Sequence, residues 1–285
     1  MDNIGRLNGI IAALEAGSKP TMAFARAERE EAIQLGLSPL TGVLFEMEHT
    51  PYSASELRDA LQFLLNRRRM IESESLQPAV TPFVRIPANG AEMNSWMAKQ
   101  VLDQGVYGVV FPHIATAEQA RNAVSACRYA RPKHAPVYEP KGVRGDAPNA
   151  AARYWGLTVP EYYARADVWP LVPEGEIMVV LMIESVEAME NLSEILAVPG
   201  VGAIMIGEGD LSQQLGHPRQ YEHPVMVEAK AKILAQAKRA GVRVAHPHVT
   251  AANVAQVIAE GYDILFTSPS RSYATAEKAK ELTQA

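Results

Sequence analysis

Short apolar runs alternate along the chain with longer stretches in which apolar residues recur at helical spacing. The runs are rich in Val, Ile, Leu, Met and Phe, and most are continuous rather than alternating. A strand has a continuous apolar sequence when helices cover both faces of its sheet, as they do around parallel sheets. We therefore predict eight parallel strands, over Thr21–Ala25, Gly42–Glu46, Pro82–Ile86, Tyr107–Phe111, Met178–Ile183, Gly202–Gly207, Val242–His246 and Asp263–Thr267.

Amphipathic stretches fill the intervals between these runs, and several begin with residues that favour helix N-termini, such as Thr116. Eight strand–helix units in succession predict one (β/α)8 TIM barrel domain over residues 1–285. A doubly wound open sheet is the alternative, but the first strand lacks the glycine-rich turn that would normally follow it there. The predicted helices are Ser53–Arg69, Glu92–Gln104, Thr116–Tyr129, Val186–Ala197, a stretch from Leu211, Pro224–Ala240, Ala251–Glu260 and Tyr273–Leu282.

Residues 128–176 interrupt this rhythm between the fourth and fifth strands. The segment is rich in Pro and Gly and holds six aromatic residues that we single out: Tyr138, Tyr154, Trp155, Tyr162, Tyr163 and Trp169. A loop of this length in a compact barrel usually serves as a lid, a binding loop or an oligomer contact. Its aromatic content argues against disorder.

Composition narrows the class of protein. The chain has 285 residues, 48% of them hydrophobic, which is enough for the core of one barrel. Its net charge is −5 and its charges are dispersed, which argues against nucleic acid or an anionic membrane as a partner. The densest basic run, Arg67–Arg69, is interpreted as the C-terminal end of a helix.

The single cysteine, Cys127, excludes an intrachain disulfide and fits a reducing cytosol. Its helix-like surroundings predict a packed side chain rather than a nucleophile. The N-terminal residues lack the apolar centre of a signal peptide, and no apolar run approaches the roughly 20 residues that span a bilayer. We therefore expect a cytoplasmic protein.

Two acidic residues occupy matching places after neighbouring strands. Glu184 directly follows Met178–Ile183, and Asp210 closes the segment that follows Gly202–Gly207. Carboxylates at the ends of adjacent strands can share one hard divalent cation, such as Mg²⁺ or Mn²⁺, with Co²⁺ also conceivable. The alternative is that each residue only caps the helix that follows it.

Other polar residues are predicted at the same end of the barrel. Arg85 projects from a strand and is expected to meet an anion, either substrate or one of the strand-end acids. Glu46 precedes His49 by three residues and can orient its imidazole as a general base; a hydrogen-bonded loop histidine is the alternative. Gly207 and Gly209 flank a turn whose amides can bind a carboxylate.

Three further histidines follow predicted strands or lie at their ends: His113, His246 and His248. They can line the barrel opening, but core or helix-capping roles fit them as well. No lysine falls at a predicted carboxyl end of a strand, which disfavours a Schiff-base aldolase and favours metal-stabilised enolate chemistry.

Six segments, taken in order, resemble the HpcH/HpaI aldolase family of metal-dependent pyruvate aldolases acting on 4-hydroxy-2-oxo acids. They are Glu46–Tyr52, Pro82–Pro87, Val101–Gly105 with Gly108–Pro112, Gly142–Gly145, Ile183–Ser185 and Ile206–Ser212. The resemblance implies a barrel whose last helix is exchanged between subunits, in a homo-oligomer that is a trimer or a hexamer built from trimers.

The same resemblance implies roles for single residues. Glu184 and Asp210 would hold the metal, Arg85 would stabilise the enolate oxygen, and His49 would be the catalytic histidine with Glu46 as its partner. The amides of Gly209 and Asp210 would hold the pyruvate carboxylate.

Three residues depart from the family pattern. Glu46 stands where Asp is common, Met182 where Gln is often found, and Glu208 where Pro is usual. We predict a class II aldolase that cleaves 4-hydroxy-2-oxo acids reversibly to pyruvate and an aldehyde. The alternatives are a CoA-thioester lyase of the citrate or malyl-CoA type and a catalytically silent metabolite-binding barrel.

Overall fold

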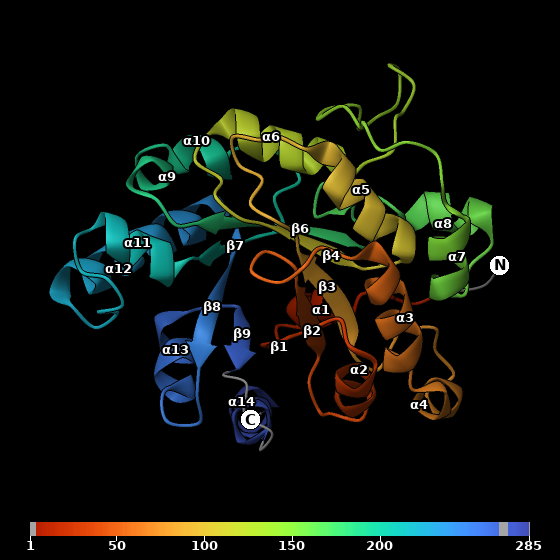
Figure 1. The fold of residues 1–285 in the computed structure, drawn as a ribbon, viewed down its shortest axis with the longest axis horizontal. Coiled ribbons are helices and arrows are strands. Elements are labelled where there is room, and N and C mark those ends of the chain that lie inside the picture. Colours follow the sequence, from red (N-terminus) through yellow and green to blue (C-terminus); the bar gives the residue numbers. More distant parts are fainter. Residues whose placement is uncertain (1–3, 268–272, 285) are drawn as a thin grey trace.

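Eight parallel strands form a closed barrel at the centre of the molecule (Figure 1). The computed structural model describes residues 4–267 and 273–284. The strands pair in the order β4-β3-β2-β1-β9-β8-β7-β6, and a pairing between β4 and β6 closes the ring. They are β1 (Thr21–Ala25), β2 (Gly42–Glu46), β3 (Thr81–Arg85), β4 (Gly108–Phe111), β6 (Ile177–Ile183), β7 (Ala203–Ile206), β8 (Arg243–Val249) and β9 (Ile264–Thr267).

Helices surround this barrel, so the predicted single-domain (β/α)8 fold is confirmed. A two-residue strand, β5 (Val168–Trp169), pairs with the start of β6. The helices are α1 (Gly9–Glu15), α2 (Arg29–Gly36), α3 (Ala54–Leu64), α4 (Arg67–Glu72), α5 (Ser95–Gln104), α6 (Ala117–Ala126), α7 (Asn149–Trp155), α8 (Val159–Arg165), α9 (Val186–Glu190), α10 (Leu192–Leu196), α11 (Glu208–Gln214), α12 (Pro224–Ala240), α13 (Val254–Glu260) and α14 (Ala274–Gln284).

Each of the eight predicted strands is present, with ends that shift by a few residues. The clearest error concerns Arg67–Arg69, which was expected at the end of a helix. The chain leaves helical geometry at Leu65, and Asn66 then caps α4, so the arginines begin a new helix. The prediction failed because Asn66 favours an N-cap more strongly than the basic run favours a C-terminus.

The register of the strands places the polar residues at one end of the barrel. Glu46 and Arg85 are direct partners across β2 and β3. Ile183 and Ile206 are partners across β6 and β7, so the residues that follow them also emerge side by side. Because all eight strands run parallel, these residues share the carboxyl end.

Helix α1 closes the amino end of the barrel. Its N-cap residue, Asn8, is fully buried and donates to the carbonyl oxygens of Tyr107 and Glu176. The Glu176 carboxylate accepts the backbone amides of Leu7 and Asn8 at 3.1 and 2.8 Å, and Arg165 of α8 donates to it at 2.9 Å. One buried acid therefore joins α1, β6 and α8.

Helices α7 and α8 of the segment 128–176 lie at this same amino end. The Trp155 ring of α7 stacks on Tyr107, which precedes β4, with 4.5 Å between ring centroids, and its indole N–H donates to the Gly105 carbonyl. Arg165 of α8 donates to the carbonyl oxygen of Gly5, in the chain that leads to α1, and Figure 1 shows α7 and α8 next to one another at the right of the view. These two helices therefore do not form a lid over the carboxyl end, which was one of the roles expected for this segment.

The last helix, α14, packs against α13 of its own chain. Exchange of this helix between subunits stays a prediction. Within the described residues, none of the helices combines the length and apolar character needed to cross a membrane.

Replacing Glu176 with Ala is expected to lower the free energy of unfolding by about 2–4 kcal/mol, because it leaves buried amides and Arg165 without their acceptor. Chemical denaturation measures this loss. Glu174→Ala is the matched control, since Glu174 is exposed two residues away and should change stability little. Equal stability of the two variants would contradict the role given to Glu176.

Candidate active site

The Glu184 carboxylate is the most deeply buried acid at the carboxyl end of the barrel. It is 2% exposed, and its Oε1 accepts the backbone amide of His113 at 2.5 Å. Burial raises the pKa of Glu184 to about 7; the His113 amide and ring oppose this shift, while the Glu48 and Asp210 carboxylates add to it. A cation placed among these acids would favour the charged form.

Asp210 follows the neighbouring strand, β7, and lies in the first turn of α11. That helix begins at Glu208, three residues earlier than predicted, so Asp210 is its third residue rather than part of a preceding loop. Gly207 is the N-cap and its own amide donates to the Ile183 carbonyl at 3.0 Å. The amides of Glu208, Gly209 and Asp210 have no partner within the helix, as is general for a first turn.

The two glycines of this turn have different roles. A Cβ on Gly207 would overlap the carboxylate and Cβ of Glu184, so this glycine makes room for the buried acid. A Cβ on Gly209 would meet no atom within 4 Å. The space for a ligand therefore lies at Gly209, while Gly207 serves Glu184, which is a role that the sequence interpretation did not include.

Arg85 lies between two glutamates of the β2 end. Its Nε donates to Glu46 Oε2 at 2.7 Å, and its Nη1 lies 3.1 Å from Glu48 Oε2. Nη1 also lies 3.8 Å from the Met182 sulfur, which occupies the place where relatives often carry Gln. The alternative of an ion pair with strand-end acids is therefore present in the structure.

The contacts of His49 differ from the expected pair with Glu46. Glu46 Oε1 accepts the backbone amides of Glu48 and His49 at 2.7 and 3.0 Å, so it holds the turn rather than the ring. The His49 ring lies 3.5 Å from Glu48 Oε2. The longer Glu46 side chain reaches across to Arg85, which leaves Glu48 as the neighbour of the imidazole.

Glu48 was not singled out from the sequence, yet it contacts every basic group of the site. Its side chain is 5% exposed and lies 3.5 Å from the rings of both His49 and His113, and 3.1 Å from Arg85. Burial raises the pKa of Glu48, and Arg85 acts in the opposite direction. Its position two residues after Glu46, on the same face, was the available signal.

The remaining histidines separate into two groups. His113 belongs to the site, because its ring lies 3.9 Å from Glu184 as well as near Glu48. His246 and His248 instead line a cavity of about 630 Å³ between α12 and α13, together with Glu208 and Lys230. Ser268, which directly follows the predicted strand Asp263–Thr267, lies outside the described residues.

Glu208 points away from the candidate active site. Its carboxylate bonds to Lys230 Nζ at 2.8 Å and to His248 Nδ1 at 2.5 Å. Burial would raise the pKa of Glu208, but these two hydrogen bonds outweigh it and lower the pKa to about 2. The additional charge that distinguishes this chain from the family pattern is therefore neutralised by neighbouring side chains.

The residues present fit a divalent cation as a two-carboxylate site. Over residues 4–267 and 273–284, no three His, Cys, Asp or Glu side chains come together as a ready cluster for a metal ion. Glu184 Oε1 accepts the His113 amide, and the Asp210 carboxylate lies near enough for its charge to raise the pKa of Glu184. Two oxygen ligands with open positions suit Mg²⁺ or Mn²⁺, which retain water and bind substrate oxygens.

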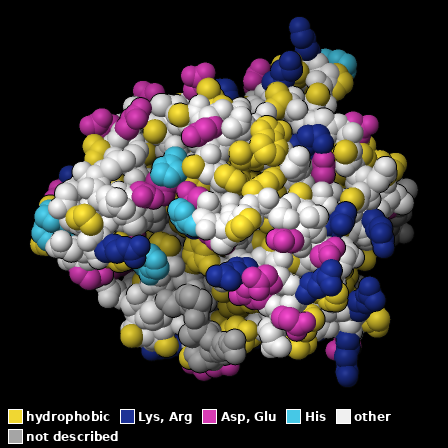
Figure 2. All heavy atoms as spheres, in the orientation of Figure 1, with side chains coloured by type: hydrophobic (Ala, Val, Ile, Leu, Met, Phe, Trp, Pro, Cys, Tyr) yellow, Lys and Arg dark blue, Asp and Glu magenta, His cyan; other side chains and the backbone are white. Residues whose placement is uncertain are grey.

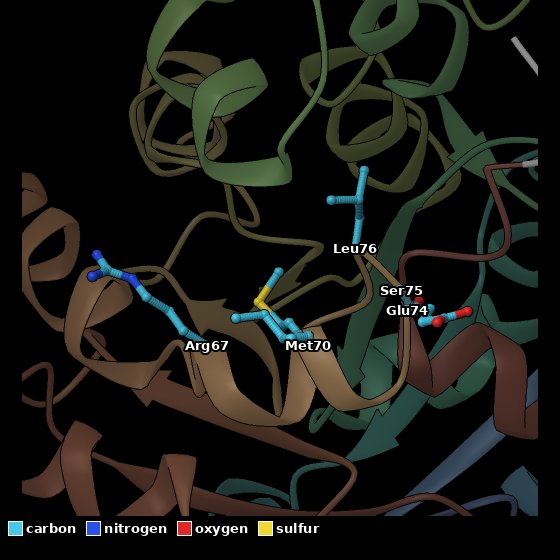
Figure 3. Close-up of a pocket in the computed structure, with 6 residues that line it drawn as sticks. Arg67, Met70, Glu74, Ser75 and Leu76 are labelled. Atoms are coloured by element: carbon cyan, nitrogen blue, oxygen red, sulfur yellow. The ribbon is translucent and has the colours of Figure 1, made fainter.

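Figure 2 shows histidine and acidic side chains next to one another, to the left of the centre of the face seen in Figure 1. A second depression, of about 390 Å³, lies at α4 and is lined by Arg67, Met70, Ile71, Glu74, Ser75 and Leu76 (Figure 3). It holds no pair of carboxylates and no histidine, so it is not the candidate active site.

Cys127 is buried at the end of α6, and burial raises the pKa of its thiol to about 12. A thiol with such a pKa is protonated and a poor nucleophile at neutral pH. The predicted packing role for Cys127 is confirmed.

Comparison with known proteins agrees with the fold. The family model of HpcH/HpaI aldolase/citrate lyase matches residues 21–268, so the chain belongs to this family. Among solved structures, an HpcH/HpaI aldolase/citrate lyase family protein from Burkholderia cenocepacia superposes with a TM-score of 0.75 at 26% identity, covering 97% of this chain and 98% of the other.

Two curated relatives are named as aldolases. A 5-keto-4-deoxy-D-glucarate aldolase from Escherichia fergusonii is 31% identical over 208 residues, which cover 73% of this chain and 68% of the relative. A 2-keto-3-deoxy-L-rhamnonate aldolase from Klebsiella pneumoniae is 34% identical over 210 residues, covering 72% and 67%. The chain is thus a carbon–carbon lyase of the HpcH/HpaI family.

Replacing either glycine of the α11 turn with alanine should change the free energy of unfolding, but in opposite directions. Gly207→Ala should lower the free energy of unfolding by about 1–3 kcal/mol, because the new methyl group displaces the buried Glu184 side chain. Gly209→Ala should raise it by up to about 1 kcal/mol, because the site is open and alanine favours helix. Urea denaturation of both variants measures the contrast, and a stable Gly207→Ala protein would contradict the packing argument.

Proposed function

We propose that this enzyme is a class II, divalent-metal-dependent aldolase. It cleaves 4-hydroxy-2-oxo acids reversibly to pyruvate and an aldehyde. The observation that carries the proposal is the buried Glu184 carboxylate, near enough to Asp210 for that charge to raise its pKa, beside the cluster of Arg85, Glu48 and His49. The names of the relatives, which describe keto-deoxy sugar acids, support substrates of this class.

The turn that carries Asp210 would bind the acid end of the substrate. The amides of Gly209 and Asp210 point from the first turn of α11, where a carboxylate is favoured, and nothing fills the space over Gly209. A Mg²⁺ or Mn²⁺ ion held by Glu184 and Asp210 would act as a Lewis acid toward the 2-oxo group. Arg85 would stabilise the oxygen that becomes negative as the enolate forms.

His49 would remove the proton from the 4-hydroxyl group of the substrate. Its ring is 68% exposed and lies beside Glu48, so it is accessible and next to a carboxylate that can orient it. As the proton leaves, the C3–C4 bond breaks, the C4 fragment departs as an aldehyde, and the bonding electrons form the enolate of pyruvate. Protonation of C3 then gives pyruvate. Glu46 would contribute by fixing the His49 turn and Arg85.

A homo-oligomer, either a trimer or a hexamer, belongs to the same proposal. The family resemblance supports it. Light scattering coupled to size-exclusion chromatography would distinguish it from a monomer.

Pyruvate release coupled to lactate dehydrogenase tests the proposal directly. Metal-stripped enzyme should be inactive on 4-hydroxy-2-oxo acids and regain activity with Mg²⁺, Mn²⁺ or Co²⁺. Asp210→Asn should reduce metal-dependent turnover by at least about 100-fold, because it removes a charged ligand. Asp59→Asn, on the partly exposed surface of α3, is the control and should remain active.

The same assay discriminates the rival functions. Cleavage of malyl-CoA with no action on free hydroxy-oxo acids would replace the proposal with a CoA-thioester lyase. Binding of oxalate or pyruvate to metal-loaded protein, with no cleavage of any substrate, would replace it with a binding-only barrel. Near-normal activity of Asp210→Asn would contradict the assignment of the metal ligand.

The role of His49 is tested by His49→Ala. Loss of a general base should lower kcat about 10²- to 10⁴-fold while KM changes little, and added imidazole should restore part of the activity. His134→Ala is the matched control, since His134 is exposed within the 128–176 segment. A His49→Ala enzyme with an unchanged kcat would exclude His49 as the base.

A further inference from the structure

We propose that Glu208, Lys230 and His248 form a clamp that positions Asp210. Glu208 is the first residue of α11 and Asp210 the third, so both belong to one helical turn. The clamp deepens the proposed function, on which it rests for the role of Asp210. Glu208 is a positioning residue here and does not contact substrate.

The clamp joins three elements around one buried carboxylate. Glu208 is 3% exposed, and its two oxygens are divided between Lys230 of α12, at 2.8 Å, and His248 of β8, at 2.5 Å. An ionised carboxylate only accepts hydrogen bonds, so the His248 Nδ1 carries the proton in this contact. The first turn of α11 is thus fixed to α12 and β8 at once.

His248 is itself held in place. Its backbone amide donates to Nδ1 of His246 at 3.1 Å, and the Tyr221 ring stacks on its imidazole with 5.4 Å between centroids. Burial lowers the pKa of His246 to about 4, so this ring is neutral at pH 7 and its Nδ1 can accept. The partner of Glu208 on β8 therefore has a defined orientation.

The opposite side of the same turn is fixed by packing. Gly207 contacts Glu184 so closely that no side chain fits between them, and its amide donates to the end of β6. Asp210 lies on a turn held by β6 through Gly207 and by α12 and β8 through Glu208. Holding a metal carboxylate to within a fraction of an ångström needs such supporting contacts.

The charge of Glu208 explains why this residue needs a positively charged partner, Lys230. Glu184 and Asp210 already place two carboxylates near one another, and an unpaired third acid in the next residues would repel an anionic substrate. Lys230 is 14% exposed and close enough to cancel the Glu208 charge. The clamp therefore adds an anchor to the turn without adding net charge to the site.

Hydrogen exchange of the metal-free protein tests the clamp without any assumption about metal. Amides of α11 should exchange at least tenfold faster in Glu208→Gln and in Lys230→Met than in the unmodified protein. The double variant should match Glu208→Gln alone, because both changes remove the same contact. Lys232→Met is the matched control: Lys232 lies on the same helix and pairs with the exposed Glu228 at 2.7 Å. Unchanged exchange in α11 would overturn the clamp.

Calorimetric measurement of Mn²⁺ binding tests whether the clamp positions Asp210. Glu208→Gln and Lys230→Met should raise the Kd for Mn²⁺ at least fivefold, whereas Lys230→Arg and Lys232→Met should leave it unchanged. A lower Tm with unchanged exchange and unchanged Kd would show a merely structural role and overturn the proposal. If the unmodified protein binds no Mn²⁺, the metal dependence in the proposed function fails, while the exchange experiment still decides the clamp.

Discussion

The buried carboxylate of Glu184 is the constraint on which the carboxyl end of the barrel depends. An acid that is 2% exposed is costly unless its neighbours compensate for the lost water. The structure supplies one backbone amide, from His113, while the nearby Glu48 and Asp210 carboxylates act against ionisation by raising the pKa of Glu184. A glycine at position 207 is required because any larger residue would enter the space of this side chain. The glycine at the start of α11 and the contact between that turn and the end of β6 both follow from this one buried side chain.

Near this acid, basic side chains lie directly against other carboxylates. Arg85 is shared between Glu46 and Glu48, and Lys230 is given to Glu208. Glu48 remains in contact with two histidines of moderate or high exposure, His49 and His113. Glu46 and Glu208 thus hold neighbouring side chains in place, while the rings of His49 and His113 are open to solvent.

The barrel could be predicted from the sequence because continuous apolar runs are a strong signal for strands covered on both faces. The strand ends followed from the same runs, and with them the positions of Glu184, Asp210 and Arg85. Side-chain pairing across strands could not be predicted, because Glu46 has the reach to contact either His49 or Arg85. Register decides the matter: Glu46 lies directly opposite Arg85. The start of α11 was missed because a glycine within a first turn gives no helical signal.

The placement of α7 and α8, within residues 128–176, separates sequence changes at the amino end of the barrel from sequence changes at its carboxyl end. This segment and α1 share the Tyr107 and Glu176 anchors at the amino end, away from the loops that carry His49 and Asp210. A change in the length of α7 or α8 would therefore leave the side chains at the carboxyl end in place. Two lineages of this fold could thus diverge in architecture and keep one chemistry, or diverge in chemistry and keep one architecture.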